Sequence, residues 1–498
     1  MDMEDQDLAQ PALLGLDLGT SGAKAVLLGV DGRPLAEAGV GYPVDSPRPG
    51  WAETDPAAWS RAVSTAVRAA CDQAAGVQVA AVGLDGQMHG LVLTDAAGQP
   101  LRPALLWADA RAGEETAAWR RLPAPRRAAL ANPIVPGMTG PLLRWVARHE
   151  PQAYRRARWA LLAKDWVRHR LTGVVATDPS DASATLLWDL PADRWADDVA
   201  AAVGLEPELL PPVASGDQAG SLRADAAEAL GLREGIPVAV GAADTAATLL
   251  ATGLTDPAQV QLTVGTGGQI VRPVAPRPSP ASAPRTHLYR AAAPDRWYAM
   301  AAVQNAGLAL DWVRRTLRAS WSELYGAARA GPPGALGVTF VPYLSGERTP
   351  VLRSDARGAW TGLGMAADRT ALLQAAVEGV TFSLRHALEA LPGPRPGHLR
   401  LAGGGTLDPR FRALLADVLQ AELRPTDVRS ASAIGAALLA AEAARLPRPA
   451  IPLSTSIPIT PSGRSAAYDE PFDRYVQLAQ RLSTVATPPP SGRPAVQT

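Results

Sequence analysis

Two short apolar runs near the start of the chain are separated by a turn of small residues. The runs cover residues 13–18 and 23–28, and the turn between them reads Gly19-Thr20-Ser21-Gly22. Apolar runs of this length on either side of a glycine-containing turn predict a β-hairpin. The tip of this hairpin lacks large side chains, so its backbone N–H groups could form a concave site for a phosphate.

A second hairpin of the same kind is predicted about half a chain later. Residues 261–264 and 268–271 flank the turn Gly265-Thr266-Gly267 in the same order of strand, turn and strand. One such hairpin is weak evidence for phosphate binding, because glycine turns between strands are common. Two copies indicate a duplicated domain that holds a nucleotide between its halves.

The two hairpins differ at one acidic position. The first has Asp17 before its turn, and the second has Thr263 at the matching place. A carboxylate beside a phosphate is repelled unless a divalent cation lies between them, and Mg²⁺ is the usual choice with nucleotides. Only the first half is therefore expected to hold the metal. A P-loop is excluded, because neither Lys24 nor Lys164 completes that motif.

The remaining pattern alternates strand-like runs with helical stretches, which predicts an α/β architecture with mixed sheets in both halves. The predicted strands are residues 79–84, 91–94, 237–243, 297–302 and 399–402. The predicted helices are residues 59–75, with Asp55 as N-cap, and 141–149, 165–171, 245–253, 307–317, 409–419 and 431–444. The proline-rich stretch 272–284 is expected to be a surface loop, and residues from about Ser483 a disordered end.

Composition narrows the class of protein. A chain of 498 residues exceeds what one core usually fills, so two domains are expected. The formal net charge is zero, which argues against nucleic-acid and membrane-surface partners. Cys71 is the only cysteine, so neither an intramolecular disulfide nor a cysteine-based metal site can form. Short apolar runs and a polar, acidic start predict a cytoplasmic protein without a membrane span.

Two segments of the first half carry side chains that could bind a sugar. Gln87 and His89 follow a predicted strand, between two glycines, and could reach a polyol. A tight turn with a surface histidine is the alternative. Trp107 and Asp109 could offer a sugar an apolar face and a hydrogen-bonding carboxylate. A core tryptophan beside a surface pair of Asp109 and Arg111 is the alternative there.

Asp244 directly follows the predicted strand 237–243 and is surrounded by small residues. A carboxylate at this place could accept a proton from a hydroxyl as a general base. It could also cap the predicted helix 245–253, and a helix N-terminus favours a transferring phosphate. Gly403-Gly404-Gly405 ends another strand without side chains, where an adenine or a phosphate could lie. A sharp turn is the alternative for these glycines.

Taken together, these motifs resemble the FGGY family of carbohydrate kinases and, within it, the xylulokinases. The likeness runs from Leu13 to the early 480s, and Gln87-Met88-His89-Gly90 is similar to the xylulokinase sugar-binding motif. Four further short motifs support it, at residues 164–166, 171–173, 177–183 and 342–350. The resemblance implies the two-domain actin, Hsp70 and hexokinase-type fold, which is ribonuclease H-like, with duplicated domains around a central cleft. The expected division is a tail 1–10, a sugar and magnesium-phosphate domain 11–246, a nucleotide domain 247–484 and a tail 485–498.

The resemblance also implies an activity and a set of site residues. The chain would be an ATP-dependent kinase that phosphorylates the terminal hydroxyl of D-xylulose with the help of Mg²⁺, and a homodimer is compatible with the family. Asp244 would be the general base, Asp17 would organise Mg²⁺, and Met88 and His89 would contact the ketose. Gln87, Trp107 and Asp109 complete the predicted sugar site, which includes Asp244. The predicted ATP contacts are Gly19, Thr20, Ser21, Gly265, Thr266, Gly404 and Gly405.

Three positions depart from the family pattern. Asp85, Thr245 and Asn305 stand where the family usually has Ser, Asn and the start of a Ser-Ala-Gly turn. Because Asn and Ser are typical partners of sugar hydroxyls, the acceptor stays open between D-xylulose and another ketose or polyol, such as ribulose, ribitol or a glycerol-like molecule. A non-catalytic, nucleotide-dependent sugar-binding regulator is the other alternative. The presence of both Asp17 and Asp244 argues against it.

Overall fold

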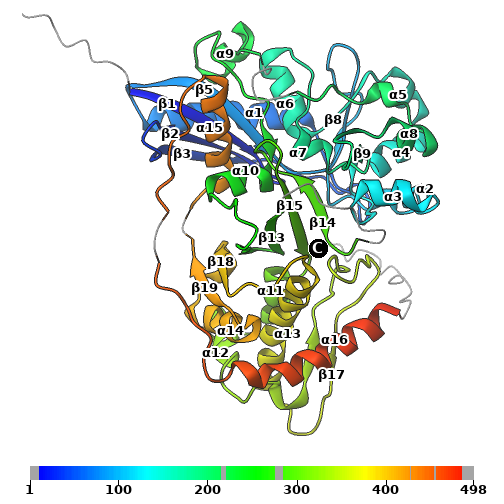
Figure 1. The fold of residues 1–498 in the computed structure, drawn as a ribbon, viewed down its shortest axis with the longest axis vertical. Coiled ribbons are helices and arrows are strands. Elements are labelled where there is room, and N and C mark those ends of the chain that lie inside the picture. Colours follow the sequence, from blue (N-terminus) through cyan, green and yellow to red (C-terminus); the bar gives the residue numbers. More distant parts are fainter. Residues whose placement is uncertain (1–9, 215–219, 275–283, 427, 454–455, 485–498) are drawn as a thin grey trace, which may run out of the picture.

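The computed structural model describes residues 10–214, 220–274, 284–426, 428–453 and 456–484. The chain forms two lobes stacked along the long axis of the molecule (Figure 1). The predicted tails lie outside the described residues, except that Gln10 begins the first strand and residues 483–484 end the last helix. None of the described helices is long and apolar enough to cross a membrane.

The first lobe is built on a five-stranded mixed sheet in the order β11-β5-β1-β2-β3. Its strands are β1 (Gln10–Leu18), β2 (Gly22–Gly29), β3 (Pro34–Gly41), β5 (Val77–Gly86) and β11 (Ala242–Ala243). The predicted first hairpin is confirmed, because β1 and β2 pair antiparallel around the turn. β5 runs parallel to β1, and β11 runs parallel to β5.

The second lobe repeats this arrangement. Its sheet has the order β14-β15-β13-β12-β18-β19. The strands are β12 (Gln261–Val264), β13 (Gly268–Val274), β14 (His287–Arg290), β15 (Trp297–Val303), β18 (His398–Ala402) and β19 (Glu422–Pro425). As in the first lobe, an antiparallel hairpin is followed on its other side by two parallel strands. The two sheets therefore confirm the predicted duplication, with β14 added at one edge.

The side-chain alternation of β1 explains how helices cover both faces of the first sheet. Leu14 and Leu16 pack with the apolar side of α1 (Pro56–Gln73), whereas Leu13 packs with α15 (Ala431–Ala443). The predicted N-cap of α1 is confirmed, since the Asp55 side chain accepts a hydrogen bond from the Ala57 backbone N–H. Burial of both faces is why these strands read as nearly continuous apolar runs.

One helix of the second half of the chain belongs by its packing to the first lobe. α15, orange in Figure 1, lies against β1 and β5 and beside α10 (Asp244–Ala251). A Cβ atom added at Gly15 would lie 1.8 Å from the Ala433 carbonyl oxygen, and only glycine permits this approach. The predicted domain 247–484 contains α15 by sequence, but this helix packs in the first lobe.

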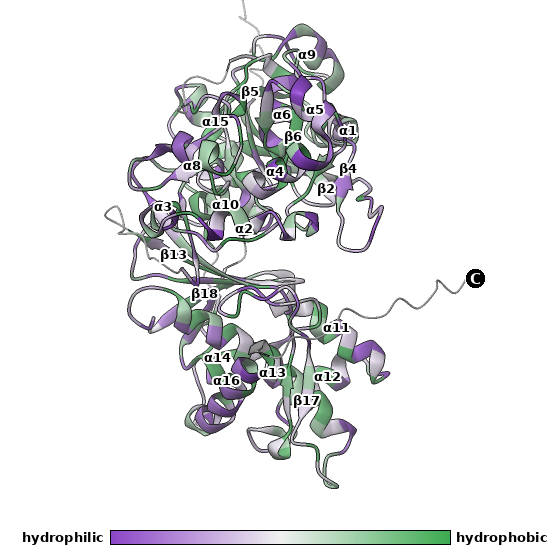
Figure 2. Cartoon of the chain, turned by 90° about the vertical axis from the view of Figure 1, so that its right-hand side faces the viewer, coloured by the Kyte–Doolittle hydropathy of each residue, from purple (hydrophilic) through white to green (hydrophobic). Residues whose placement is uncertain are grey.

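Smaller elements complete the two lobes. The first lobe also contains β4 (Glu53–Thr54), β6 (Val92–Thr94), β7 (Ala104–Leu105), β8 (Trp159–Leu161), β9 (Trp188–Asp189), β10 (Arg194–Trp195), α2 (Thr116–Arg120), α3 (Ala124–Leu130), α4 (Thr139–His149), α5 (Pro151–Arg156), α6 (Ala163–Thr172), α7 (Pro179–Ala182), α8 (Asp197–Ala202) and α9 (Ala224–Leu230). The second lobe contains α11 (Gly307–Thr316), α12 (Trp321–Ala327), α13 (Arg369–Ala390), α14 (Pro409–Leu419), α16 (Asp469–Thr484), β16 (Thr339–Val341) and β17 (Ala359–Thr361). Figure 2 shows hydrophilic stretches on peripheral helices such as α5.

Two predicted elements need correction. Residues 237–243 run beside β5, but only Ala242–Ala243 form a regular strand, because Pro237 lacks an N–H and Gly241 adopts a positive φ of 89°. The predicted loop 272–284 begins later than expected, since β13 continues to Val274. Residues 275–283 of that loop lie outside the described residues.

Candidate active site

Three aspartates meet where parallel strands of the first sheet end. Asp17 near the end of β1 pairs in register with Asp85 near the end of β5, and Ala242 of β11 pairs with Asp85 on its other side. Asp244 follows β11 directly. The carboxyl ends of parallel strands share one edge of a sheet, and this edge is where open α/β sheets bind ligands. Two of the three were predicted site residues, and Asp85 joins them.

Asp244 has the electrostatics of a general base. Burial and the neighbouring charge of Asp17 raise the pKa of Asp244 to about 7. Its Oδ1 accepts hydrogen bonds from the Thr245 backbone N–H at 2.5 Å and from the Thr245 hydroxyl at 3.1 Å. The expected N-cap role is not what the structure shows, because α10 begins at Asp244 itself and Ala243 occupies the cap position without a side-chain cap. Thr245 therefore orients the Asp244 carboxylate.

Asp17 and Asp85 form a close carboxylate pair. The Ser432 hydroxyl, at the start of α15, donates a hydrogen bond of 2.8 Å to Asp17 Oδ2. Burial raises the pKa of Asp17, and burial together with the charges of Asp17 and Asp244 raises the pKa of Asp85 well above its usual range. Asp85 is fully buried, and neither of its carboxylate oxygens has a hydrogen-bond donor. In the sequence, Asp85 stood out only because the family usually has a serine at this position. The parallel pairing of β1 with β5 places it beside Asp17, and an alignment of these two strands could have predicted this.

The first hairpin tip is held by side chains from three other segments. The Tyr42 hydroxyl donates to the Gly19 carbonyl, and the Trp107 indole N–H donates to the Thr20 hydroxyl at 2.8 Å. Gln87, predicted to reach the sugar, instead directs its amide N–H at the Gly19 carbonyl, 3.4 Å away. These contacts give the tip Gly19-Thr20-Ser21 a fixed shape, which a phosphate site requires.

His89 is buried and held neutral, so the alternative of a surface histidine is excluded. Burial and the charge of Arg348 lower the pKa of His89 to about 3. Its Nδ1 lies 2.6 Å from the Ala184 carbonyl oxygen, which can only accept, so Nδ1 carries the proton and Nε2 is left as an acceptor. Met88 is buried beside His89, and its sulfur atom accepts a hydrogen bond of 3.7 Å from the Tyr298 hydroxyl of the second lobe.

Asp109 is committed to structural contacts. Its carboxylate accepts hydrogen bonds from the Ala52 backbone N–H at 2.7 Å and from the Arg111 guanidinium at 2.8 and 2.9 Å. The expected Asp109–Arg111 pair exists, but it is buried and not on the surface. Asp109 therefore shapes the wall of the site and has little capacity left for a sugar hydroxyl.

A cleft with a volume of about 190 Å³ lies between the lobes and is lined by both. The first lobe contributes Trp107 and Asp109, and the second contributes Gln304, Ser345 and Arg348. The Arg348 guanidinium lies 5.8 Å from the centre of the Trp107 ring. Burial lowers the pKa of this guanidinium, and the neighbouring Tyr289 and Glu347 side chains act in the opposite direction.

Two of the predicted nucleotide residues of the second lobe, Gly404 and Gly405, line another cavity. The tip of the second hairpin docks on α11, because the Gly307 and Leu308 N–H groups donate to the Gly265 and Thr266 carbonyls. A cavity of about 530 Å³ lies beside it and is lined by Gly307, Trp321, Tyr325, Gly404, Gly405 and Leu407, among others. The Trp321 and Tyr325 rings stack with centroids 5.6 Å apart. Sequence reasoning missed both aromatic residues, which lie on α12 without a motif around them.

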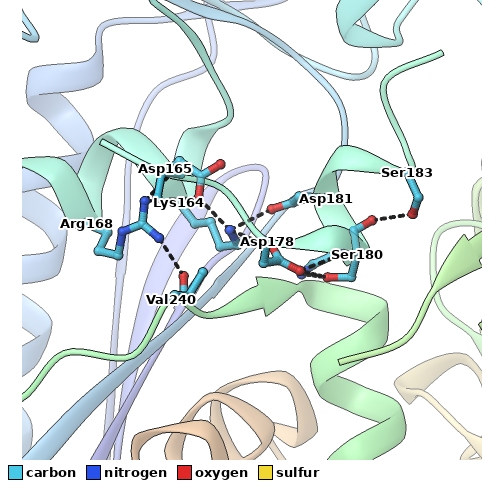
Figure 3. Close-up of polar contacts among 10 residues, drawn as sticks. Lys164, Asp165, Arg168, Asp178, Ser180, Asp181, Ser183 and Val240 are labelled. Atoms are coloured by element: carbon cyan, nitrogen blue, oxygen red, sulfur yellow. Dashed lines mark hydrogen bonds and ion pairs between the residues drawn. The ribbon is translucent and has the colours of Figure 1, made fainter. Parts of the chain in front are cut away.

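A buried charged network surrounds Lys164 (Figure 3). The Lys164 ammonium contacts Asp165 at 2.6 Å, Asp178 at 2.9 Å and Asp181 at 3.1 Å. Burial alone would lower the pKa of Lys164, but these three carboxylates outweigh it and raise that pKa. The Ser180 hydroxyl donates to Asp178 and accepts from the Ala243 N–H. The motifs at residues 164–166 and 177–183 were quoted above only for their family likeness. Their side chains form this network, which contacts β11, the strand directly before Asp244.

Comparison with known proteins agrees with this geometry. The model of the FGGY family of carbohydrate kinases matches residues 12–251 with its N-terminal domain and residues 260–444 with its C-terminal domain. The xylulose kinase of Escherichia coli strain K12 is 35% identical over 485 residues, which are 94% of this chain and 99% of that protein. The crystal structure of a xyloylose kinase from Brucella ovis has a TM-score of 0.87 and 36% identity, over 95% of this chain and 99% of that one. The xylulose kinase structure from Rhodospirillum rubrum has a TM-score of 0.84 and 29% identity, with coverage of 95% and 99%.

Proposed function

The chain belongs to the FGGY family of carbohydrate kinases, and we propose that it transfers the γ-phosphoryl group of ATP to the terminal hydroxyl of D-xylulose. The observation that carries this proposal is the half-buried carboxylate of Asp244, whose pKa of about 7 suits a base at neutral pH. The choice of D-xylulose is supported by relatives named xylulose kinases that match nearly the whole chain. The runner-up acceptors are another ketose or a polyol.

Asp244 would remove the proton of the attacking hydroxyl. Its two hydrogen bonds from Thr245 occupy Oδ1, which leaves Oδ2 for the sugar. Phosphoryl transfer demands mainly positioning and charge neutralisation, with the attacking and leaving oxygens in line. The base at the end of β11 and the hairpin at the end of β1 lie on one sheet edge, which is the arrangement that this reaction needs.

The sugar would lie in the cleft between the lobes. His89 Nε2 could accept a hydrogen bond from a sugar hydroxyl, and Met88 would pack against the carbon chain. Arg348 faces the same place from the second lobe and could donate to the ketose oxygens. Because the two lobes contribute different contacts, sugar binding would draw them together and exclude water from the γ-phosphoryl group.

ATP would bind across both hairpins. The backbone N–H groups of Thr20, Ser21 and Thr266 are proposed to hold the phosphates. The N–H groups of Gly19 and Gly265 donate to the Gly22 and Gly267 carbonyls, so these two glycines would shape the hairpin tips and leave room for the phosphates. The adenine would lie in the cavity beside Gly404 and Gly405, against the Trp321 side chain, which is 42% exposed. Aromatic rings of this kind stabilise a base by stacking.

Mg²⁺ fits the residues at the first hairpin. Asp17 offers the hard carboxylate oxygen that this cation prefers. Within the described ranges no group of three or more His, Cys, Asp or Glu side chains is arranged to hold a metal. This agrees with the habit of Mg²⁺ of binding through one or two carboxylates and the phosphates of its nucleotide. When bound, it would neutralise phosphate charge.

The test is an acceptor panel. Purified protein is incubated with ATP, Mg²⁺ and one of D-xylulose, D-ribulose, other pentuloses, hexuloses, ribitol, xylitol or glycerol, and ADP release is measured. We expect the highest kcat/KM with D-xylulose and formation of its 5-phosphate. A higher kcat/KM with another sugar would change the proposed acceptor but not the proposed kinase activity. If the protein binds ATP and a sugar but transfers no phosphoryl group to any acceptor, the result would support the alternative of a non-catalytic sugar-binding regulator.

A further inference from the structure

Among the described residues, no Lys, Arg or His forms an ion pair with Asp17 or Asp85, although the charge of Lys24 acts to lower the pKa of Asp17. The two carboxylates lie within hydrogen-bonding reach of each other, on neighbouring parallel strands in register. Asp85 has 0% exposed surface, and both of its oxygens lack a donor among the described residues. Two carboxylates in contact repel each other strongly in a buried site unless a proton or a cation lies between them.

The nearest cationic side chains are engaged elsewhere. Lys24 lies close enough to Asp17 to affect its pKa, but its ammonium donates to the Ser430 hydroxyl at 3.0 Å and lies 3.8 Å from Glu37. Lys164 is surrounded by three other carboxylates. Asp85 also faces Asp244 and Asp181. A single proton would therefore leave excess negative charge at the edge where the triphosphate is proposed to bind.

We propose that Asp85 joins Asp17 as a second carboxylate ligand of the divalent cation, and that the cation is held only together with the nucleotide phosphates. The absence of a three-ligand group among the described side chains explains why phosphate oxygens must complete the coordination. The inference rests on the proposed kinase function.

The experiment measures binding and not turnover. Mn²⁺ replaces Mg²⁺ as a probe, and its binding to the protein with ADP is followed by electron paramagnetic resonance and calorimetry. Asp85→Asn keeps the size of the side chain and a hydrogen-bond donor for Asp17, but it removes the negative charge. We expect the affinity for Mn²⁺ with ADP to fall at least about tenfold. ADP in the presence of a chelator should bind as tightly as to the wild type or more tightly, because one repulsive charge is gone.

Asp417→Asn is the matched control. Asp417 is an equally buried aspartate of the second lobe, bound to the Ser462 hydroxyl, and its substitution should leave Mn²⁺ binding unchanged. If Asp85→Asn does not fold, Asp85→Ser decides, since it also removes the charge. Wild-type affinity for Mn²⁺ with ADP in the charge-removed variant would overturn the proposal and leave a proton between the two carboxylates. Failure of the wild type to bind ADP with Mn²⁺ would instead overturn the kinase function itself.

Discussion

The Ala243 backbone N–H donates a hydrogen bond of 2.9 Å to the Ser180 hydroxyl oxygen. This bond joins the residue before Asp244 to the network around Lys164, because the Ser180 hydroxyl donates in turn to Asp178 (Figure 3). β11 has only two residues, so its own ladder provides little to hold Asp244 in place. We infer that Ser180 is a positioning residue for the base.

Ser180→Ala removes the acceptor of the Ala243 N–H and should lower kcat roughly tenfold to a hundredfold, because a small displacement of a reacting group is costly. KM for the sugar should change little. The stability loss should be about 1–3 kcal/mol, the cost of unsatisfied buried groups. Ser183→Ala is the control, since Ser183 is an equally buried serine that does not contact Ala243. Equal loss of kcat in both variants would contradict the positioning role.

Asp244→Asn retains the shape of the side chain but removes the base. We expect kcat to fall by about two to four orders of magnitude, the usual contribution of general acid–base catalysis. The KM for the sugar should stay near the wild-type value. Because the Asp244 side chain does not cap α10, the melting temperature should not fall. A kcat close to the wild type would exclude Asp244 as the base.

The pH dependence of kcat/KM for the sugar follows from the same carboxyl. Burial and Asp17 raise the pKa of Asp244 in the free protein to about 7, and only the unprotonated form can accept a proton. Because kcat/KM reports the pKa of the free enzyme, it should be constant above this pKa and fall about tenfold per pH unit below it. Burial also raises the pKa of Glu378 on α13 to about 7, so Glu378→Gln serves as the control and should keep the profile. A wild-type profile that is flat below neutrality would disprove the assignment.

Arg348→Met tests the contribution of the second lobe to sugar binding. Loss of a charged hydrogen-bond donor to the sugar should raise its KM roughly tenfold to a hundredfold, with the KM for ATP nearly unchanged. Arg348→Lys should restore part of the affinity. Arg357→Met is the control, because the Arg357 guanidinium donates to the Ser354 and Ala356 backbone carbonyls and does not line the cleft among the described residues. An unchanged sugar KM in Arg348→Met would remove this residue from the site.

Trp321→Ala tests the adenine cavity. If the indole stacks on the base, its loss should raise the KM for ATP about fivefold to a hundredfold, which corresponds to about 1–3 kcal/mol. The KM for the sugar should be unaffected. Trp159→Ala, a half-buried tryptophan of the first lobe, controls for general destabilisation. A normal KM for ATP would place the adenine elsewhere.

The sequence by itself determined the elements whose signals are local. The two hairpins follow from apolar runs around glycine turns, and both are present with β1–β2 and β12–β13 paired as predicted. The helix start at Asp55 follows from a short-range hydrogen bond within four residues. Such features depend on neighbours in the chain, so the pattern of side chains is sufficient to predict them.

The tertiary structure alone decided which distant side chains share a partner. The sequence around Asp109 allowed it to bind a sugar. In the folded protein, its carboxylate instead accepts hydrogen bonds from the Arg111 guanidinium and the Ala52 N–H. The helix α15 could not be assigned to the first sheet from its own apolar residues, because its place depends on close contact with Gly15. Asp85 became a candidate ligand only when the register of β1 and β5 put it beside Asp17. Contacts of this kind join residues far apart in the chain, and their energies depend on burial and on neighbouring charges that no local pattern contains.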